Sequence, residues 1–406
     1  MDRPTGRKEI DLDTPTIAPR GRVNEALAFR RPDRTPRDFA AVPEIWQGLG
    51  RHFGTHDRNE ILRQLGVDCR VVSYDSFCRS PEVAAEQVDM DASQERSSVG
   101  GMWRRVEPDG SNRDIWGAHR ARVANAFGVL EQFVSFPLQS AQSVEDLKRY
   151  RWPAPDWWDF RPIRAAIAEL NRRPGSRETD PPLPPGEGRG EIVGTRYHIR
   201  YRLGSVFETA WSLYGFERML MDLAASPAMP AYVMERIAEV HLENLHVVLE
   251  TTGDLIDLVY FYDDVASQEG LLMSPALYEQ RLQPFHQRII DLASRYGKPV
   301  MMHSCGSVYR LIPRLIDMGL AVLNPIQPSA RWMEPERLAA EFGGRLAFHG
   351  GIDVQQFLPR ATPSEVRDKV ARTCEVLGHS GGYILAGSHH IQADTPIENV
   401  LAVYQS

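Results

Sequence analysis

The segment from Lys298 to Gln327, "KPVMMHSCGSVYRLIPRLIDMGLAVLNPIQ", decides the fold. It begins with a continuous apolar run, residues 299–302, which predicts a buried strand. Residues 307–319 have the apolar spacing of an amphipathic helix that ends at Gly319, and residues 320–327 form a second apolar run. Two buried strands joined by a helix through short loops indicate parallel strands with a crossover helix.

The same alternation continues on both sides of this segment. Further strands are predicted at 254–264, 345–353 and 382–391, and helices at 274–296, 334–343 and 362–378. So many units in succession favour a closed barrel, and we therefore predict an α/β protein with a single (β/α)8 TIM barrel over residues 23–406. Two polar segments stand apart, a disordered N-terminal tail at 1–22 and a Pro/Gly-rich surface insertion at 172–191.

The composition is that of an ordinary globular protein. The chain has 406 residues, of which 42% are hydrophobic and 25% charged, and its net charge of −7 offers no basic field for nucleic acid. No apolar run approaches the ~20 residues that span a bilayer, so we predict a cytoplasmic protein with no membrane or nucleic-acid partner. The four cysteines are scattered, which favours reduced thiols over a disulfide framework.

Residues with imidazole, thiol, carboxylate or amide side chains follow one predicted strand after another. In a (β/α)8 barrel the C-terminal ends of the strands meet at one mouth, where the active site lies. Random strand ends would carry mostly turn formers such as Gly, Asn, Ser and Asp. The series found here therefore predicts one site, formed by Tyr262, Asp263, Asp264, His303, Cys305, Asn324, Gln327, His349, Asp353, His389 and His390.

His303 and Cys305 are the core of this prediction. Residues i and i+2 of a strand point to the same side, so both side chains can face the mouth. Catalytic zinc takes three protein ligands and keeps one position open, and His389 or His390 is the obvious third donor. Taken in isolation, a His-x-Cys pair would instead be interpreted as a packed thiol beside a hydrogen-bonded imidazole.

The remaining residues are expected to handle substrate and protons. Adjacent strand residues face opposite sides, so one of Asp263 and Asp264, with Asp264 preferred, is expected only to organise the loop. His349 precedes two glycines and could instead hold Asp353 in position. We assign catalytic roles to Asp264, His349 and Asp353, and substrate binding to Tyr262, Asp263, Asn324, Gln327 and His390.

Six segments of the sequence, taken in their order along the chain, resemble the uroporphyrinogen decarboxylase-like superfamily. This superfamily contains the heme-pathway decarboxylase and cobalamin-linked zinc methyltransferases. The resemblance extends from about Val23 onward, and it implies a single (β/α)8 barrel and a homodimer. The segments are "RRPDRTPRDF", "YDDVASQEGLLMSPALYEQRLQPFHQRI", "HSCGSVYRLIPRLIDMG", "LNPIQPSA", "FHGGIDVQQFLP" and "GGYILAGSHHIQADTPIENVLAVY".

The chain looks nearest to the methyltransferase branch. That branch binds zinc through His-x-Cys and a later cysteine, and here His303 and Cys305 match while His389 stands at the late position. The resemblance thus implies His303, Cys305 and His389 as metal ligands. The "RQAGR"-like motif of the decarboxylase branch is absent, and "RRPDRTPRDF" takes its place. A corrinoid signature, Asp-x-His-x-x-Gly, is also missing, so cobalamin would be carried by a separate protein.

The resulting hypothesis is a zinc-dependent alkyl (methyl) transferase or demethylase that acts on a small molecule, with a separate corrinoid protein as a partner. One alternative is a metal-free decarboxylase or lyase acting on a carboxylated substrate. Another is a non-catalytic barrel that binds a ligand. Metal analysis of the purified protein distinguishes the first hypothesis from the other two.

Overall fold

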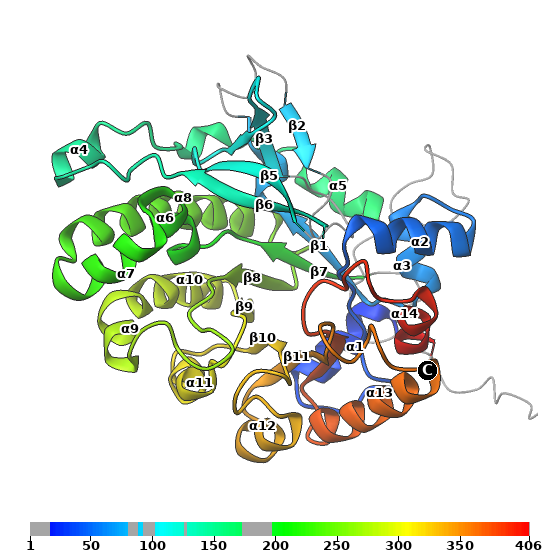
Figure 1. Ribbon diagram of the computed structural model, residues 1–406. Coiled ribbons are helices and arrows are strands. Elements are labelled where there is room, and N and C mark those ends of the chain that lie inside the picture. The colour runs from blue at the N-terminus through cyan, green and yellow to red at the C-terminus, as the bar shows by residue number, and fades with distance from the viewer. Residues whose placement is uncertain (1–16, 80–87, 92–101, 126–127, 173–196, 406) are drawn as a thin grey trace, which may run out of the picture.

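A computed structural model describes residues 17–79, 88–91, 102–125, 128–172 and 197–405 (Figure 1). Of the insertion predicted at 172–191, only Arg172 is among these residues, and residues 1–16 of the predicted tail also lie outside them. The first helix, α1 (Pro19–Leu27), begins inside the segment assigned to the tail.

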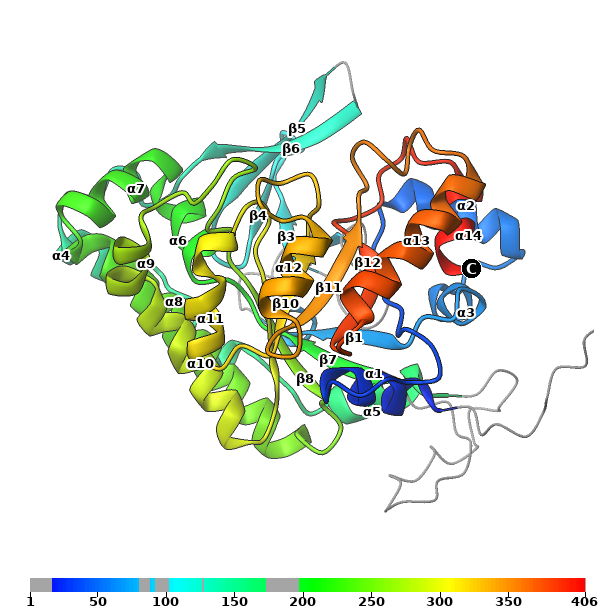
Figure 2. The same cartoon turned by 90° about the horizontal axis from the view of Figure 1, so that it is seen from below.

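A curled parallel sheet forms the centre of the fold (Figures 1 and 2). It has seven strands in the order β1-β7-β8-β9-β10-β11-β12. Apart from the ends of β8, β9 and β12, these strands are almost wholly buried, as expected for parallel strands that are covered on both faces. Their bounds are β1 Cys69–Ser73, β7 His198–Arg202, β8 Leu258–Tyr262, β9 Val300–His303, β10 Val322–Ile326, β11 Ala347–Ile352 and β12 Tyr383–Gly387.

A short extended segment lies between the two ends of this sheet. Leu385 of β12 donates its N–H to the carbonyl of Pro36, and Asp38 donates its N–H back to Leu385. Arg37 in turn accepts a hydrogen bond from the N–H of Asp68, next to β1. The structure therefore shows a half-barrel with a connecting segment, and the complete eight-stranded barrel is not confirmed.

Helices cover the outside of the curled sheet (Figure 2). Two of them differ from the prediction: the helix expected at 274–296 is broken at Leu282, because Pro284 has no N–H to donate to Gln280, and the helix expected at 307–319 is reduced to a 3₁₀ turn and α11. None of the helices in the described ranges has both the length and the apolar character needed to cross a bilayer. The helices after α1 are α2 Pro43–Phe53, α3 Arg58–Gln64, α4 Val144–Lys148, α5 Ile163–Leu170, α6 Phe207–Tyr214, α7 Phe216–Ala225, α8 Ala228–Thr252, α9 Pro275–Arg281, α10 Gln283–Arg295, α11 Ile312–Asp317, α12 Pro335–Phe342, α13 Pro363–Gly378 and α14 Ile397–Tyr404.

A second, antiparallel sheet is inserted between β1 and β7, and the sequence analysis did not anticipate it. It has five strands in the order β2-β3-β4-β5-β6 and lies at the top of Figure 1. We call it the cover sheet, because its side chains share a cavity with the ends of the parallel strands. Its strands are β2 Val88–Asp91, β3 Met102–Val106, β4 Asn112–Asp114, β5 His119–Asn125 and β6 Gly128–Ser135.

Candidate metal centre and active site

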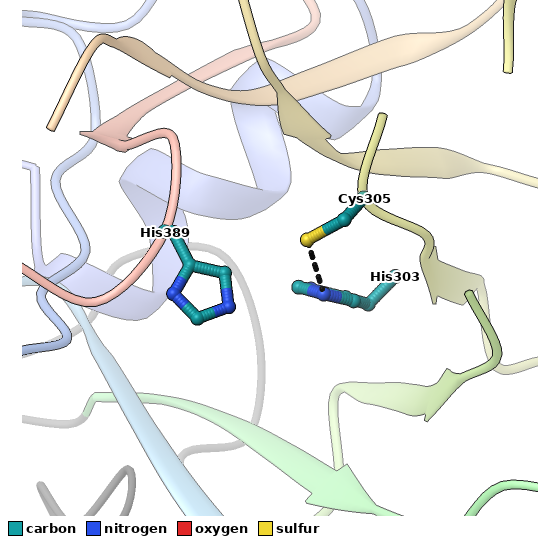
Figure 3. Close-up of side chains that lie close together, drawn as sticks. All are labelled: His303, Cys305 and His389. Carbon is teal, nitrogen blue, oxygen red and sulfur yellow. Dashed lines mark hydrogen bonds between the residues drawn. The ribbon is translucent and has the colours of Figure 1, made fainter. Parts of the chain in front are cut away.

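His303, Cys305 and His389, which we call the metal trio, converge at the C-terminal ends of the parallel strands (Figure 3). His303 is the last residue of β9, Cys305 follows it by two positions, and His389 comes two residues after β12 ends. One potential ligand atom of each lies within 4.8 Å of the other two. The Cys305 Sγ is 3.3 Å from the His303 Nε2. One thiol and two imidazole rings, all of them donors that bind zinc, therefore face a common point.

Neighbouring residues fix the conformation of the loop after β9. Gly306 has φ +82°, and a Cβ there would lie 2.3 Å from the Ser267 carbonyl oxygen, so only glycine fits without strain. The Gly306 N–H donates to Gln327 Oε1 at 2.9 Å, and the Cys305 N–H donates to Asp264 Oδ1 at 2.7 Å. Gln327 and Asp264 thus aim the Cys305 thiol.

Behind the metal trio, a chain of polar side chains runs into the interior of the curled sheet. His303 Nδ1 is 2.6 Å from Asn324 Oδ1, and Asn324 Nδ2 is 2.5 Å from His349 Nδ1. His349 Nε2 is 2.7 Å from Asp38 Oδ2, and Asp38 forms an ion pair with Arg200. Asn324, His349, Asp38 and Arg200 are all buried. The chain links the candidate metal ligand to a buried carboxylate.

The charges in this chain shift one another's pKa. Burial alone would raise the pKa of Asp38, but the Arg200 guanidinium and the His349 ring together hold it well below its ordinary value. Burial lowers the pKa of His349, against the opposing effect of Asp38. At neutral pH the chain therefore contains an ionised carboxylate and a neutral imidazole.

On the other side of the metal trio, carboxylates gather at the start of α6. Asp263 is fully buried, and it accepts hydrogen bonds from the backbone N–H groups of Val206 and Glu208 and lies 2.8 Å from His286 Nε2. Glu208 Oε1 accepts the N–H of Asp264 at 2.9 Å. Burial, followed by the charges of Asp264 and Asp263, raises the pKa of Glu208 to about 8. Glu208 can therefore gain or lose a proton near neutral pH.

The metal trio opens onto a cavity of about 500 Å³ between the strand ends and the cover sheet. Arg202 lies 3.3 Å from Asp75, Arg120 lies 2.8 Å from Asp114, and Arg104 forms an ion pair with Glu131. The lining also carries a group of aromatic side chains. These are Tyr74, Trp116, Phe133, Trp211, Tyr260 and Tyr262.

The structure distributes the predicted residues other than Cys305 over four places. Tyr262, Asp264, His303, His389 and His390 line the cavity, whereas Asn324 and His349 belong to the buried chain behind it. Gln327 and Asp263 hold backbone instead of facing the cavity. Asp353 accepts the N–H groups of Gln355 and Gln356 in the turn after β11 and is not part of the cavity lining.

Three functional candidates were missed by the sequence analysis: Asp38, Arg200 and Glu208. Asp38 lies in "RRPDRTPRDF", which entered the analysis only as part of the family resemblance. Arg200 lies in the middle of β7. Glu208 belongs to no motif, and its role depends on the carboxylates that the fold places around it.

Known proteins resemble this chain to different extents. Among solved structures, a methyltransferase from Methanosarcina mazei superposes with a TM-score of 0.59 at 16% identity, over 95% of this chain and 97% of that chain. An endo-1,4-beta-xylanase from Penicillium canescens aligns with a TM-score of 0.30 at 12% identity, over 48% of this chain and 63% of that chain, which is too low to support a shared fold. A search of curated proteins gave no match.

The family comparison is the more specific result. The model of the family described as uroporphyrinogen decarboxylase (URO-D) matches residues 195–406, more than half of the chain. The matched part contains β7 to β12, the metal trio and Glu208. The chain belongs to the uroporphyrinogen decarboxylase (URO-D) family.

Proposed function

We propose that this protein is a zinc-dependent methyltransferase or demethylase that acts on a small molecule, with cobalamin carried by a separate protein. The observation that supports it most is the convergence of His303, Cys305 and His389 on one point beside a large cavity. The fold shared with a methyltransferase of Methanosarcina mazei agrees with this proposal.

The donor set suits zinc. One thiolate and two imidazoles are typical zinc ligands, and zinc bond lengths place neighbouring donor atoms about 3.4–3.6 Å apart. The Sγ of Cys305 and the Nε2 of His303 are 3.3 Å apart, and the third donor lies within 4.8 Å, so a small movement of His389 completes the set. The cavity on the open side leaves room for a substrate heteroatom as the fourth ligand.

Zinc bound here would polarise the substrate heteroatom and lower its pKa. We assign the accompanying proton transfer to Glu208, which lines the same cavity. When a thiol is methylated, the ionised Glu208 takes the S–H proton while the sulfur–carbon bond forms and the bond from carbon to its carrier breaks. In demethylation, the bond from the methyl carbon to the substrate heteroatom breaks, a bond from carbon to the carrier forms, and the protonated Glu208 gives its proton to the heteroatom.

Other residues would orient the substrate without reacting. Tyr262 and His390 line the cavity beside the metal trio, and Asp264 holds the backbone of Cys305. The arginines of the cavity, Arg104, Arg120 and Arg202, each face a carboxylate. This pairing makes a polycarboxylate substrate, as a decarboxylase would require, less favourable.

Metal analysis and a methyl-transfer assay test the proposal. We expect about one zinc per chain after purification without chelator, and transfer of the methyl group of methylcobalamin to at least one thiol of a small panel. Cys305→Ala should lose zinc and transfer together, whereas Cys374→Ala, away from the site, should keep both. A wild-type protein that binds no zinc at micromolar concentration would rule the proposal out.

We further propose that the protein is a cytoplasmic homodimer. We also propose that residues 36–38 occupy the position of the eighth strand of the barrel. The scattered free cysteines agree with a reducing compartment. The exposed side chains of Phe216 and Met221 on α7 offer an apolar surface for a second copy. Sedimentation of a pure monomer at micromolar concentration would contradict the dimer.

A further inference from the structure

The hydrogen bonds between the buried polar side chains behind His303 all run in one direction, from donor to acceptor. Asp38 is ionised, because Arg200 is paired with it. His349 Nε2 lies 2.7 Å from Asp38 Oδ2 and 3.3 Å from Arg200 Nη1, and the shorter contact, with the carboxylate, places a hydrogen on Nε2. A neutral imidazole has one N–H, so His349 Nδ1 is an acceptor and must face the NH₂ group of Asn324. The opposite end of the Asn324 amide, its oxygen, then faces His303 Nδ1.

The direction determines the tautomer of His303. Because the Asn324 oxygen only accepts, His303 Nδ1 must carry the ring hydrogen, and the lone pair is left on Nε2. Nε2 is the atom that lies 3.3 Å from the Cys305 sulfur and 3.7 Å from Asp264 Oδ1. The lone pair thus points into the metal trio.

The opposite arrangement would disable this ligand. If the Asn324 amide were turned over, its NH₂ group would donate to His303 Nδ1 and the hydrogen would move to Nε2. His349 would then need a hydrogen on Nδ1, and as a neutral ring it would present a bare Nε2 to the Asp38 carboxylate. A bare Nε2 would have only the longer contact with Arg200 Nη1, at 3.3 Å, as a hydrogen-bond donor, and the negative charge of Asp38 at 2.7 Å opposes that state.

The backbone holds Asp38 in place for this task. Its N–H donates to the carbonyl of Leu385 on β12 at 2.9 Å, and its carbonyl accepts the hydroxyl of Tyr404 at 2.7 Å. Asp38 is 7% exposed, His349 is 5% exposed and Arg200 is 2% exposed. The charged pair is therefore shielded from water, and Asp38 keeps its charge beside His349.

We propose that Asp38, acting through His349 and Asn324, is a positioning residue that sets the tautomer of His303 and so prepares its Nε2 to bind metal. This inference rests on the metal site of the proposed function, and not on the methyl transfer. Such outer partners of a ligating histidine typically contribute 10–100-fold to metal affinity.

Zinc affinity of variants tests the proposal. Asp38→Asn should weaken zinc binding by about 10–100-fold, measured by competition with a chromophoric chelator. The control is Asp68→Asn, another buried carboxylate, paired with Arg22 and Arg34, which does not reach the metal trio. It should lower stability without changing zinc affinity. An equal loss of affinity in the two variants would overturn the proposal.

A rescue variant separates positioning from structural damage. Asn324→Asp places a carboxylate beside His303 Nδ1, which accepts its hydrogen whatever the state of His349. Asp38→Asn/Asn324→Asp should therefore bind zinc more tightly than Asp38→Asn alone. A double variant that binds no more tightly would count against the proposal.

The tautomer itself can be observed in the metal-free wild-type protein, which needs no variant to fold. Nitrogen NMR of labelled histidine, assigned with His303→Gln, should show the hydrogen of His303 on Nδ1. A hydrogen on Nε2 would overturn the inference, whatever the enzyme does. If the hydrogen is on Nδ1 and zinc binds but no methyl transfer occurs, the inference stands and the proposed function fails.

Discussion

Replacing Glu208 with glutamine should change how stability depends on pH. The pKa of Glu208 is about 8 in the folded protein, against an ordinary value of 4.5. Between these two values the folded state binds more protons at this group than the unfolded state does. The free energy of unfolding therefore falls as the pH rises from 4.5 to 8, and Glu208 contributes no further change outside that window.

The magnitude follows from the same interval. At about 1.36 kcal/mol per pH unit, the interval from 4.5 to 8 corresponds to an upper limit of about 5 kcal/mol. Glu208 is half-buried, so water screens part of its repulsion from Asp263 and Asp264. We expect about 2 kcal/mol to remain. Glu208→Gln keeps the oxygen that accepts the Asp264 N–H, so the charge is the main change.

Urea unfolding of the metal-free protein at pH 5 and at pH 9 measures the effect. Relative to wild type, Glu208→Gln should gain about 2 kcal/mol of stability on going from pH 5 to pH 9. Glu217→Gln, at an exposed position of α7, is the control and should show no such gain. A difference between wild type and Glu208→Gln that is the same at pH 5 and at pH 9 would refute the reasoning.

Three further predictions concern the metal trio and the loop that carries Cys305. His389→Ala should weaken zinc binding by ~10²-fold, because one ligand contributes roughly 3 kcal/mol, whereas His390→Ala should retain zinc in the same competition assay; the reverse result would make His390 the ligand. Gly306→Ala should destabilise the protein by about 2 kcal/mol or more in thermal unfolding, because its Cβ would meet the Ser267 carbonyl oxygen. Gly344→Ala, which has φ +76° but open space around the added Cβ, should cost less, and equal losses would contradict the steric argument. Zinc should protect Cys305 from iodoacetamide, as read by mass spectrometry, and leave the labelling of Cys374 unchanged; protection of both thiols would point to a general effect on the fold.

Local patterns in the sequence were sufficient for the second half of the fold. From residue 254 onward, the predicted strands include β8 to β12, because buried parallel strands and amphipathic helices leave periodic signals within a few residues. The same local signals brought His303 and Cys305 together with His389 or His390, since strand ends converge in such folds, and the family resemblance selected His389. The break between α9 and α10 was missed, although Pro284 was its visible cause.

Only the tertiary structure decided which polar residues act together. Asp38 contacts His349, which is 311 positions away in the sequence, and Glu208 contacts Asp264, which is 56 positions away. Periodic patterns in a sequence do not extend over such separations. Of the adjacent carboxylates Asp263 and Asp264, the fold buries the first and turns the second to the cavity. Electrostatic interactions depend on distance in space and on burial, not on position along the chain. The sequence by itself therefore determined which residues are candidate metal ligands. The tertiary structure decided which charged groups and hydrogen-bond partners surround them.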